Sequence, residues 1–187
     1  MLKYNGSILK LPSKAIVDYT TPPDPLSSTI IGTQKWTNTI LTIDDGGEGI
    51  ITSNDVTING TNIGTVCYYT KDAAARIVQQ YYKWGWRIPS SSDIDTMVNY
   101  IGGYNTSTAL KLKYTSLWSN PGTNDYDFNA IPCGMYEPNN TYRNNGTEFS
   151  FWGTNNYRMY ILNNNSIVNG TETGDYKFML RFVKDVT

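Results

Sequence analysis

The side chains that most often carry out enzymatic chemistry are scarce in this chain. It contains no histidine, which removes the usual general base and the imidazole that activates a serine or cysteine nucleophile. The two cysteines, Cys67 and Cys133, have a spacing that fits no zinc pattern. We expect them to be free thiols, and the alternative is a disulfide between them. These observations favour a protein that is not an enzyme and that needs no metal or other cofactor.

Four carboxylates remain as candidates for acid–base or calcium chemistry. Glu137 and Glu148 could form a general acid–base pair, but both lie in a stretch rich in asparagine and glycine, where we expect surface exposure. Asp125 and Asp127 lie in the sequence GTNDYDF and could bind calcium through carboxylate and carbonyl oxygens. Hydrogen bonds from these side chains within a turn are the interpretation that we favour.

Asparagine, tyrosine and arginine are concentrated in two C-terminal stretches of the chain. Tyrosine rings can stack on sugar rings, and asparagine amides can both donate to and accept from hydroxyl groups. Such a surface suits a glycan or a protein epitope, whereas the alternative is that these residues only form soluble turns. We expect them to cluster at one end of the fold. The candidate ligand-binding residues are Asn139, Asn140, Tyr142, Arg143, Asn144, Asn155, Asn156, Tyr157, Arg158, Tyr160, Asn163 and Asn164.

The length and composition of the chain limit the kind of fold that can hold these side chains. The 187 residues, of which 39% are hydrophobic, are enough for one domain with a core of its own. Charged residues make up 17% of the chain and the net charge is -1, so the basic patch typical of nucleic-acid binding is missing. The N-terminal sequence MLKYNGSILKLPSKAIV is broken by polar residues and proline, which predicts neither an export signal nor membrane insertion.

The chain divides into a short arm and one domain. Residues 1–27 contain short alternating pieces followed by the proline-rich DYTTPPDPLSS, which predicts an N-terminal arm and a linker. Residues 28–187 are expected to form the domain. Its first part alternates like strands, and Asn59 with Gly60 predicts a hairpin turn.

Two segments have the periodicity of amphipathic helices. Thr70 can cap the segment KDAAARIVQQYYKW, and Gly85 marks its end. The second helix lies in SSSDIDTMVNYIGG, where Ser91 or Ser92 can serve as the N-cap and Gly102 ends the helix. The buried face of this helix is expected to contain Ile94, Met97, Val98 and Ile101.

The remaining sequence predicts loops and short antiparallel strands. Segments such as EFSFWG, RMYIL and YKFMLRFVKD are expected to form short strands. Two helices combined with such strands indicate an α+β fold. The aromatic core under the loops is expected to contain Trp118, Phe128, Ile131, Phe149, Phe151 and Trp152.

The order of these landmarks resembles one known family. IGTQKW, GTVCYYTKDAAARI, KWGWRIPSSSDIDTMVNYIGG, ALKLK, LWSNPGTNDYDFNAIPCGMY, FSFWGTN and YKFMLRFVKD are similar to the Fibrobacter succinogenes major paralogous domain. The resemblance covers residues 28–187 and implies a C-type-lectin-like fold, related to the formylglycine-generating sulfatase-modifying fold and to the variable proteins of diversity-generating retroelements. It says little about function, because such folds carry many activities.

The chain departs from that family at its cysteines and at a lectin motif. Family members often have a cysteine before the GWR-like tripeptide and another near the C-terminus, where this chain has KW before Gly85 and has Phe182. The family's bridge between the helix and the last strand is therefore absent here, which suits folding in a reducing cytoplasm. Glu137-Pro138-Asn139 looks like the calcium and mannose tripeptide of related lectins, but the aspartate of the later motif is missing from WGTNN.

These expectations combine into one functional hypothesis. A lectin-like binding domain without an export signal, carried on a short arm, is typical of a bacteriophage virion protein made in the host cytoplasm, such as a head fibre, decoration protein or tail-tip adhesin. Its expected partners are a host-surface glycan or protein, and other virion proteins through residues 1–27. We expect a homotrimer, in which avidity strengthens weak contacts. The alternatives are a purely structural capsid or tail component, and a bacterial surface carbohydrate-binding module at an extracellular or cell-surface location.

Overall fold

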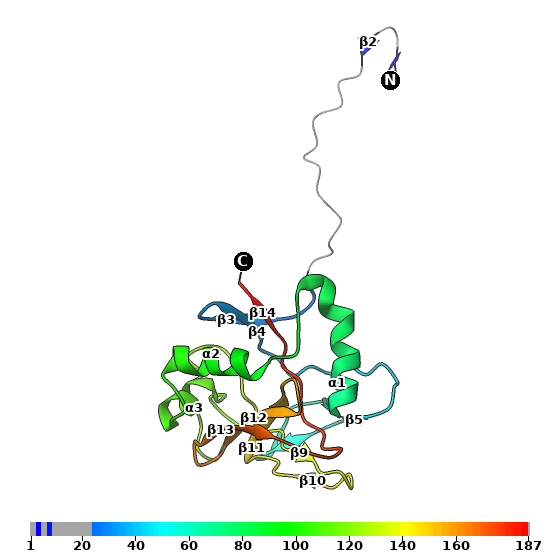
Figure 1. Ribbon diagram of the computed structural model, residues 1–187. Helices are drawn as coiled ribbons and strands as arrows, with labels where there is room; N and C mark the ends of the chain where they lie inside the picture. Colours follow the sequence, from blue (N-terminus) through cyan, green and yellow to red (C-terminus); the bar gives the residue numbers. More distant parts are fainter. Residues whose placement is uncertain (1–2, 5–6, 9–23, 187) are drawn as a thin grey trace.

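The computed structural model describes residues 3–4, 7–8 and 24–186. It is a mixed α+β structure in which helices and several small antiparallel sheets surround a common interior (Figure 1). Within this described part of the chain, no helix is long and apolar enough to cross a membrane. The predicted arm and linker lie mostly outside the described residues, except for a pairing of β1 (Lys3–Tyr4) with β2 (Ser7–Ile8).

Short strands form the scaffold. The first sheet has the order β14-β4-β3, so the last strand of the domain pairs with an early one. A second three-stranded sheet has the order β11-β12-β13, and residues 24–186 also contain the strand pairs β5-β8, β6-β7 and β9-β10. The bounds are β3 Ser28–Ile31, β4 Gln34–Thr37, β5 Ile50–Ser53, β6 Thr57–Ile58, β7 Thr61–Asn62, β8 Val66–Tyr69, β9 Met135–Tyr136, β10 Tyr142–Arg143, β11 Glu148–Trp152, β12 Tyr157–Leu162, β13 Ile167–Thr171 and β14 Val183–Asp185.

The predicted Asn-Gly hairpin is confirmed. Ile58 of β6 pairs with Thr61 of β7, which leaves Asn59 and Gly60 as a two-residue turn. Their φ angles are 47° and 84°, and a turn with positive φ at both central residues matches the twist of the strands that it joins.

The first predicted helix begins and ends where expected but changes character midway. Thr70 accepts a hydrogen bond from the backbone of Ala73, and α1 runs over Lys71–Val78. A tighter 3-10 helix, η1, continues over Gln79–Trp84 and ends at Gly85, whose φ is 81°. Glycine reaches this left-handed conformation without a steric cost, which makes it a natural helix stop.

The second helix, α2, covers Ser91–Ile101 and differs from the prediction at its first residue. Its N-cap is Ser90, one residue before the predicted Ser91 or Ser92. The side chain of Asp93 accepts from the backbone of Ser90 while Ser90 accepts from the backbone of Asp93, and this reciprocal capping box fixes the start. Gly102 is the C-cap as predicted, and the predicted buried face is confirmed at Ile94, Met97, Val98 and Ile101.

A third helix was not expected. The helix α3 covers Thr106–Leu112, and its N-cap Asn105 accepts a hydrogen bond from the backbone of Thr108. Two threonines and a serine in its seven residues lower its intrinsic helix propensity, so the prediction of two helices was one too few. Burial of Ala109 and Leu112 in the core stabilises this short helix.

Aromatic side chains fill the interior as predicted. Trp118, Phe128, Phe149, Phe151 and Trp152 are all buried. The rings of Phe128 and Phe149 meet edge to face with centroids 5.9 Å apart, a favourable geometry for aromatic pairs. Ile131, the remaining predicted core residue, is partly buried and packs against the cluster that contains Phe128 and Phe149.

The domain begins before residue 28. Asp24 accepts hydrogen bonds from the indole nitrogen of Trp86 at 2.9 Å and from Nζ of Lys184 at 2.5 Å. Leu26 packs against a core cluster that includes Trp86. Residues 24–27, which the sequence assigned to the linker, are therefore joined to the domain near its last strand.

Candidate ligand-binding surface

The β9–β10 hairpin carries the first group of predicted site residues. The hydroxyl of Tyr142 donates to the backbone oxygen of Cys133 at 2.8 Å, and its ring stacks on Tyr136 with centroids 4.9 Å apart. Burial raises the pKa of Tyr142 to about 12. This hydroxyl is turned into the fold, which corrects the expectation that it is available to a ligand.

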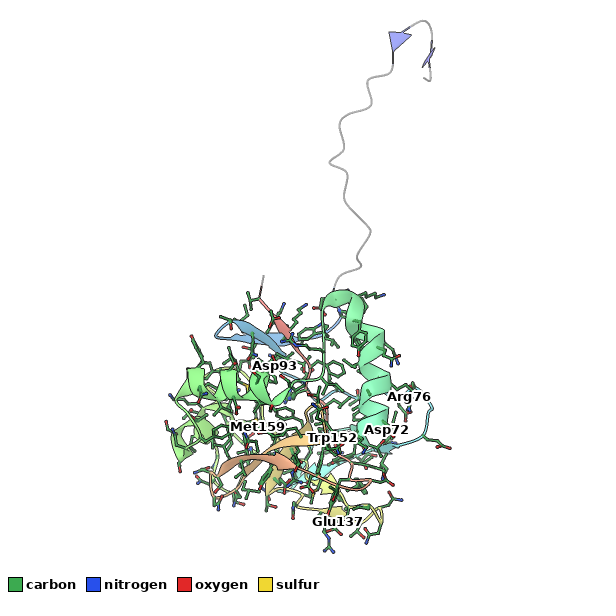
Figure 2. All side chains as sticks on the ribbon, in the orientation of Figure 1. Asp72, Arg76, Asp93, Glu137, Trp152 and Met159 are labelled. Atoms are coloured by element: carbon green, nitrogen blue, oxygen red, sulfur yellow. The ribbon has the colours of Figure 1, made fainter. Side chains whose placement is uncertain are left out.

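The tip of this hairpin is exposed. Asn139 and Asn140 are both exposed, and the side-chain oxygen of Asn140 accepts from Nζ of Lys177 at 2.8 Å. The exposed Arg143 forms an ion pair with Glu137 at 3.3 Å. Figure 2 shows Glu137 at the bottom of the molecule, at the end where this hairpin projects.

Arg158 is buried, contrary to the prediction. Its side chain is 9% exposed and lies between Glu148 at 3.6 Å and Glu172 at 3.4 Å. The guanidinium stacks over the rings of Tyr160, at 4.2 Å, and Phe178, at 4.7 Å. Arg158 of β12 therefore connects its own strand to β11, through Glu148, and to Glu172. Glu148 is 3% exposed, which corrects its expected place on the surface.

The turn between β11 and β12 presents a second group. Asn155 is exposed and Asn156 is half-buried, and both adopt left-handed backbone conformations with φ of 57° and 61°. They line a mainly apolar cavity of about 250 Å³, together with Trp152 and with Asp72 from the first turn of α1. Figure 2 shows Trp152 in the interior and Asp72 at the lower end of α1.

Tyr157 is half-buried and faces the α2 side of the sheet. Its ring packs against the core cluster that contains Ile94 and Met97. Burial, followed by the nearby Asp95 carboxylate, raises the pKa of Tyr157. Because side chains alternate along a strand, Tyr157 lies on the opposite face of β12 from Arg158 and Tyr160.

The remaining asparagines lie at the other end of the β11-β12-β13 sheet. Asn144 donates to Glu148 at 2.7 Å. Asn163 accepts from the backbone of Asn120 and Asn164 from the backbone of Ser166. The turn that contains Asn155 and the turn that contains Asn163 are separated by the six residues of β12, or about 20 Å. The expected single cluster is therefore wrong.

One surface nevertheless unites part of the predicted set. The segment 172–177 connects the hairpin tip to the β11–β12 turn, because the backbone of Glu172 donates to Asn156 at 2.9 Å and Lys177 binds Asn140. We call residues 137–141, 154–156 and 172–176 the hairpin face. In Figure 1 the β9–β10 hairpin lies at the bottom, opposite β14 and the C-terminus at the top.

Three of the other side chains considered for catalysis or metal binding are buried or hydrogen-bonded within the fold. Cys67 and Cys133 are buried free thiols, as predicted, and burial raises the pKa of Cys133 to about 12, so its thiol stays protonated. Asp127 accepts from the amides of Asn38 and Asn129, which supports the turn interpretation of that residue. The described residues contain no group of three or more acidic or cysteine side chains placed to hold a metal ion.

Sequence reasoning missed the contribution of Lys177 and of the segment before it. Lys177 lies in YKFML, a mostly apolar segment, and nothing in the sequence indicates that its side chain reaches Asn140. It also missed a cavity of about 640 Å³ bordered by Asn38, Tyr114 and Asn129. The several Asn and Asp residues in GTNDYDFNA were the only signal for it.

Comparison with models of known protein families, with curated proteins and with solved structures finds no match for this chain. The structure establishes the α+β class. Any function must therefore be inferred from the geometry of the surfaces and from the sequence landmarks.

Proposed function

We propose that this protein is a non-enzymatic recognition module of a bacteriophage virion, and that it binds a host-surface glycan or protein through the hairpin face. The finer fold assignment, a C-type-lectin-like domain over residues 28–187, belongs to the same proposal. It is supported by the order of the sequence landmarks and is compatible with the mixed α+β architecture.

The observation that carries the proposal is the position of the hairpin face. The chain enters the domain at Asp24, which contacts Lys184 of β14, and Figure 1 shows the β9–β10 hairpin at the other end of the molecule. A domain attached through residues 1–27 would therefore present the β9–β10 hairpin of this face outward. Exposed Asn139, Asn155 and Thr173 offer small polar side chains suited to adaptable hydrogen bonding.

Assembly as a homotrimer is part of the proposal. Three copies anchored side by side through residues 1–27 would present three hairpin faces in one direction. Simultaneous engagement multiplies a modest affinity by about 10² or more, which suits a surface made of small polar residues.

A purely structural role in a capsid or tail is the second candidate. It is favoured by the amides that are already used inside the fold: Asn139 accepts from the backbone of Thr141, and Asn164 from that of Ser166. Under this hypothesis the asparagines stabilise turns and contact no ligand.

Bulky substitutions distinguish the two candidates. Thr154→Trp and Thr173→Trp each place a large ring on the hairpin face at an exposed position, and Ser107→Trp, at an exposed position of α3, is the matched control. The full chain, displayed in many copies on beads, is tested on bacterial envelopes and on a glycan array. We expect the first two variants to reduce binding at least tenfold and the control to retain it. Absence of binding by the unsubstituted chain at high display density favours the structural role.

A further inference from the structure

A second concave surface shares no lining residue with the hairpin face and is not part of the proposed site above. It is a cavity of about 640 Å³, a volume in the range of small-molecule sites. Its walls come from four parts of the chain, and we call the lining residues the amide groove. They are Asn38, Thr39, Ile40, Thr61, Ile63, Tyr114, Ser116, Leu117, Asn124, Asp127, Asn129 and Ile131.

The walls of the amide groove are tied to one another by side-chain hydrogen bonds. Asn129 donates to the backbone oxygen of Asn38 at 3.0 Å, and Asn59 in the β6–β7 turn donates to the backbone oxygen of Leu117 at 2.7 Å. The buried guanidinium of Arg181 donates to the backbone oxygens of Thr39 and Asn129. The groove is therefore preformed, which reduces the entropy lost when a ligand binds.

Four lining residues adopt left-handed backbone conformations, and one of them, Leu117, is strained. Asn124, Asp127 and Asn129 have φ of 54°, 51° and 55°, and Leu117 has φ of 72°. A left-handed conformation is accessible to asparagine and aspartate but costly for leucine. Such strain persists where the surrounding structure enforces it, and it gathers at ligand sites.

The lining combines hydrogen-bonding groups of both kinds with apolar surface. The exposed Asp127 carboxylate is oriented by two amide donors, Asn38 at 2.8 Å and Asn129 at 3.0 Å, and each of its oxygens keeps acceptor capacity. The hydroxyl of Ser116 can donate or accept. The ring of Tyr114 and the side chain of Ile63 contribute apolar surface to the lining.

We propose that the amide groove binds a neutral carbohydrate of one or two sugar units. Sugar hydroxyls need both donors and acceptors, and the apolar face of a pyranose ring packs on tyrosine or aliphatic side chains. The lining contains no lysine or arginine and one carboxylate, Asp127, so an acidic sugar would meet repulsion without a compensating cation. An ammonium ligand would use the acceptors only and leave the hydroxyl donors unpaired.

The experiment uses the full chain and defined probes. Lactose, mannobiose and N,N′-diacetylchitobiose serve as neutral disaccharides, sialyllactose as an acidic sugar and spermidine as a cation, each titrated by saturation-transfer NMR. Ser116→Trp fills the groove from an exposed lining position, and Thr115→Trp places the same ring on the exposed neighbouring residue, which does not line the groove. Thermal unfolding confirms that both variants remain folded.

We expect at least one neutral disaccharide to bind saturably, with affinity at least tenfold weaker in Ser116→Trp and unchanged in Thr115→Trp. Three results would overturn the proposal: no neutral disaccharide binds, binding survives Ser116→Trp in the folded protein, or only sialyllactose or spermidine binds. The hairpin-face variants Thr154→Trp and Thr173→Trp should leave disaccharide binding to the groove intact. Failure of the proposed virion function is thereby distinguishable from failure of this inference.

Discussion

Arg158 combines a positive charge with a position inside the fold. It neutralises the buried Glu148 and packs on two aromatic rings. Arg158→Met keeps an apolar side chain of similar reach but leaves Glu148 without its counter-ion. Because breaking a buried ion pair strands a charge, we expect a loss of about 3 kcal/mol in the free energy of unfolding.

Chemical denaturation measures this loss. The matched control is Arg143→Met, which removes an exposed ion pair with Glu137 and should cost no more than about 1 kcal/mol. Equal effects of the two substitutions would contradict the structural role assigned to Arg158.

Lys113 makes stability depend on pH in the alkaline range. Its side chain is fully buried, donates to Asn165 at 2.7 Å and lies 4.2 Å from the centre of the Trp118 ring. Burial lowers the pKa of Lys113 to about 8 from 10.5. Between these values the unfolded chain binds the proton more tightly, so the contribution of Lys113 to the free energy of unfolding should rise with pH.

The control for this prediction is Lys113→Met, which keeps every other titrating group. As pH rises from about 8 to about 10, the unsubstituted protein should gain stability relative to Lys113→Met, measured as the difference between their free energies of unfolding. A difference independent of pH would show that Lys113 has an ordinary pKa.

The β9–β10 hairpin depends on one glycine. Gly134 has φ of 68°, and an added Cβ would lie 2.2 Å from the backbone oxygen of Arg143. Gly134→Ala combines backbone strain of about 1 to 3 kcal/mol with this collision, so the hairpin must shift. Gly174→Ala, with φ of 100° and only an ordinary contact of 3.5 Å with Pro138, carries the strain without the collision. Thermal unfolding should show a lower Tm for Gly134→Ala than for Gly174→Ala, and the reverse order would refute the collision.

Local rules predicted those elements that are fixed by neighbouring residues. The Asn59-Gly60 turn, the cap at Thr70 and the stop at Gly85 follow from conformational preferences of single residues, and each is confirmed. The helix α3 escaped prediction because tertiary burial outweighs its weak propensity.

The candidate site was harder to predict for a physical reason. Whether Tyr142 or Arg158 faces solvent depends on which distant segment covers it. Tyr68 of β8 contacts the first, and Glu172 and Phe178 cover the second. Composition showed that the turns are rich in amides, but it contained no information about which amides the fold itself uses.

At the scale of the whole molecule, the attachment of residues 24–27 predicts where the domain can be cut. A chain that begins at Asp24 keeps the ion pair with Lys184, the indole hydrogen bond of Trp86 and the packing of Leu26. A chain that begins at Ser28 leaves the Trp86 nitrogen without this partner. We expect the shorter chain to be less stable by about 1 to 3 kcal/mol, measured by urea unfolding. Equal stability of the two chains would show that residues 24–27 contribute nothing to the fold.

The pairing of β14 with β4 also sets the order in which this domain can be completed. Strand β4 is made early in synthesis, but its partner and the guanidinium of Arg181 belong to the last few residues of the sequence. A nascent chain can therefore pair β3 with β4 early, but the other edge of β4 stays unpaired until Val183–Asp185 have been made and have left the ribosome.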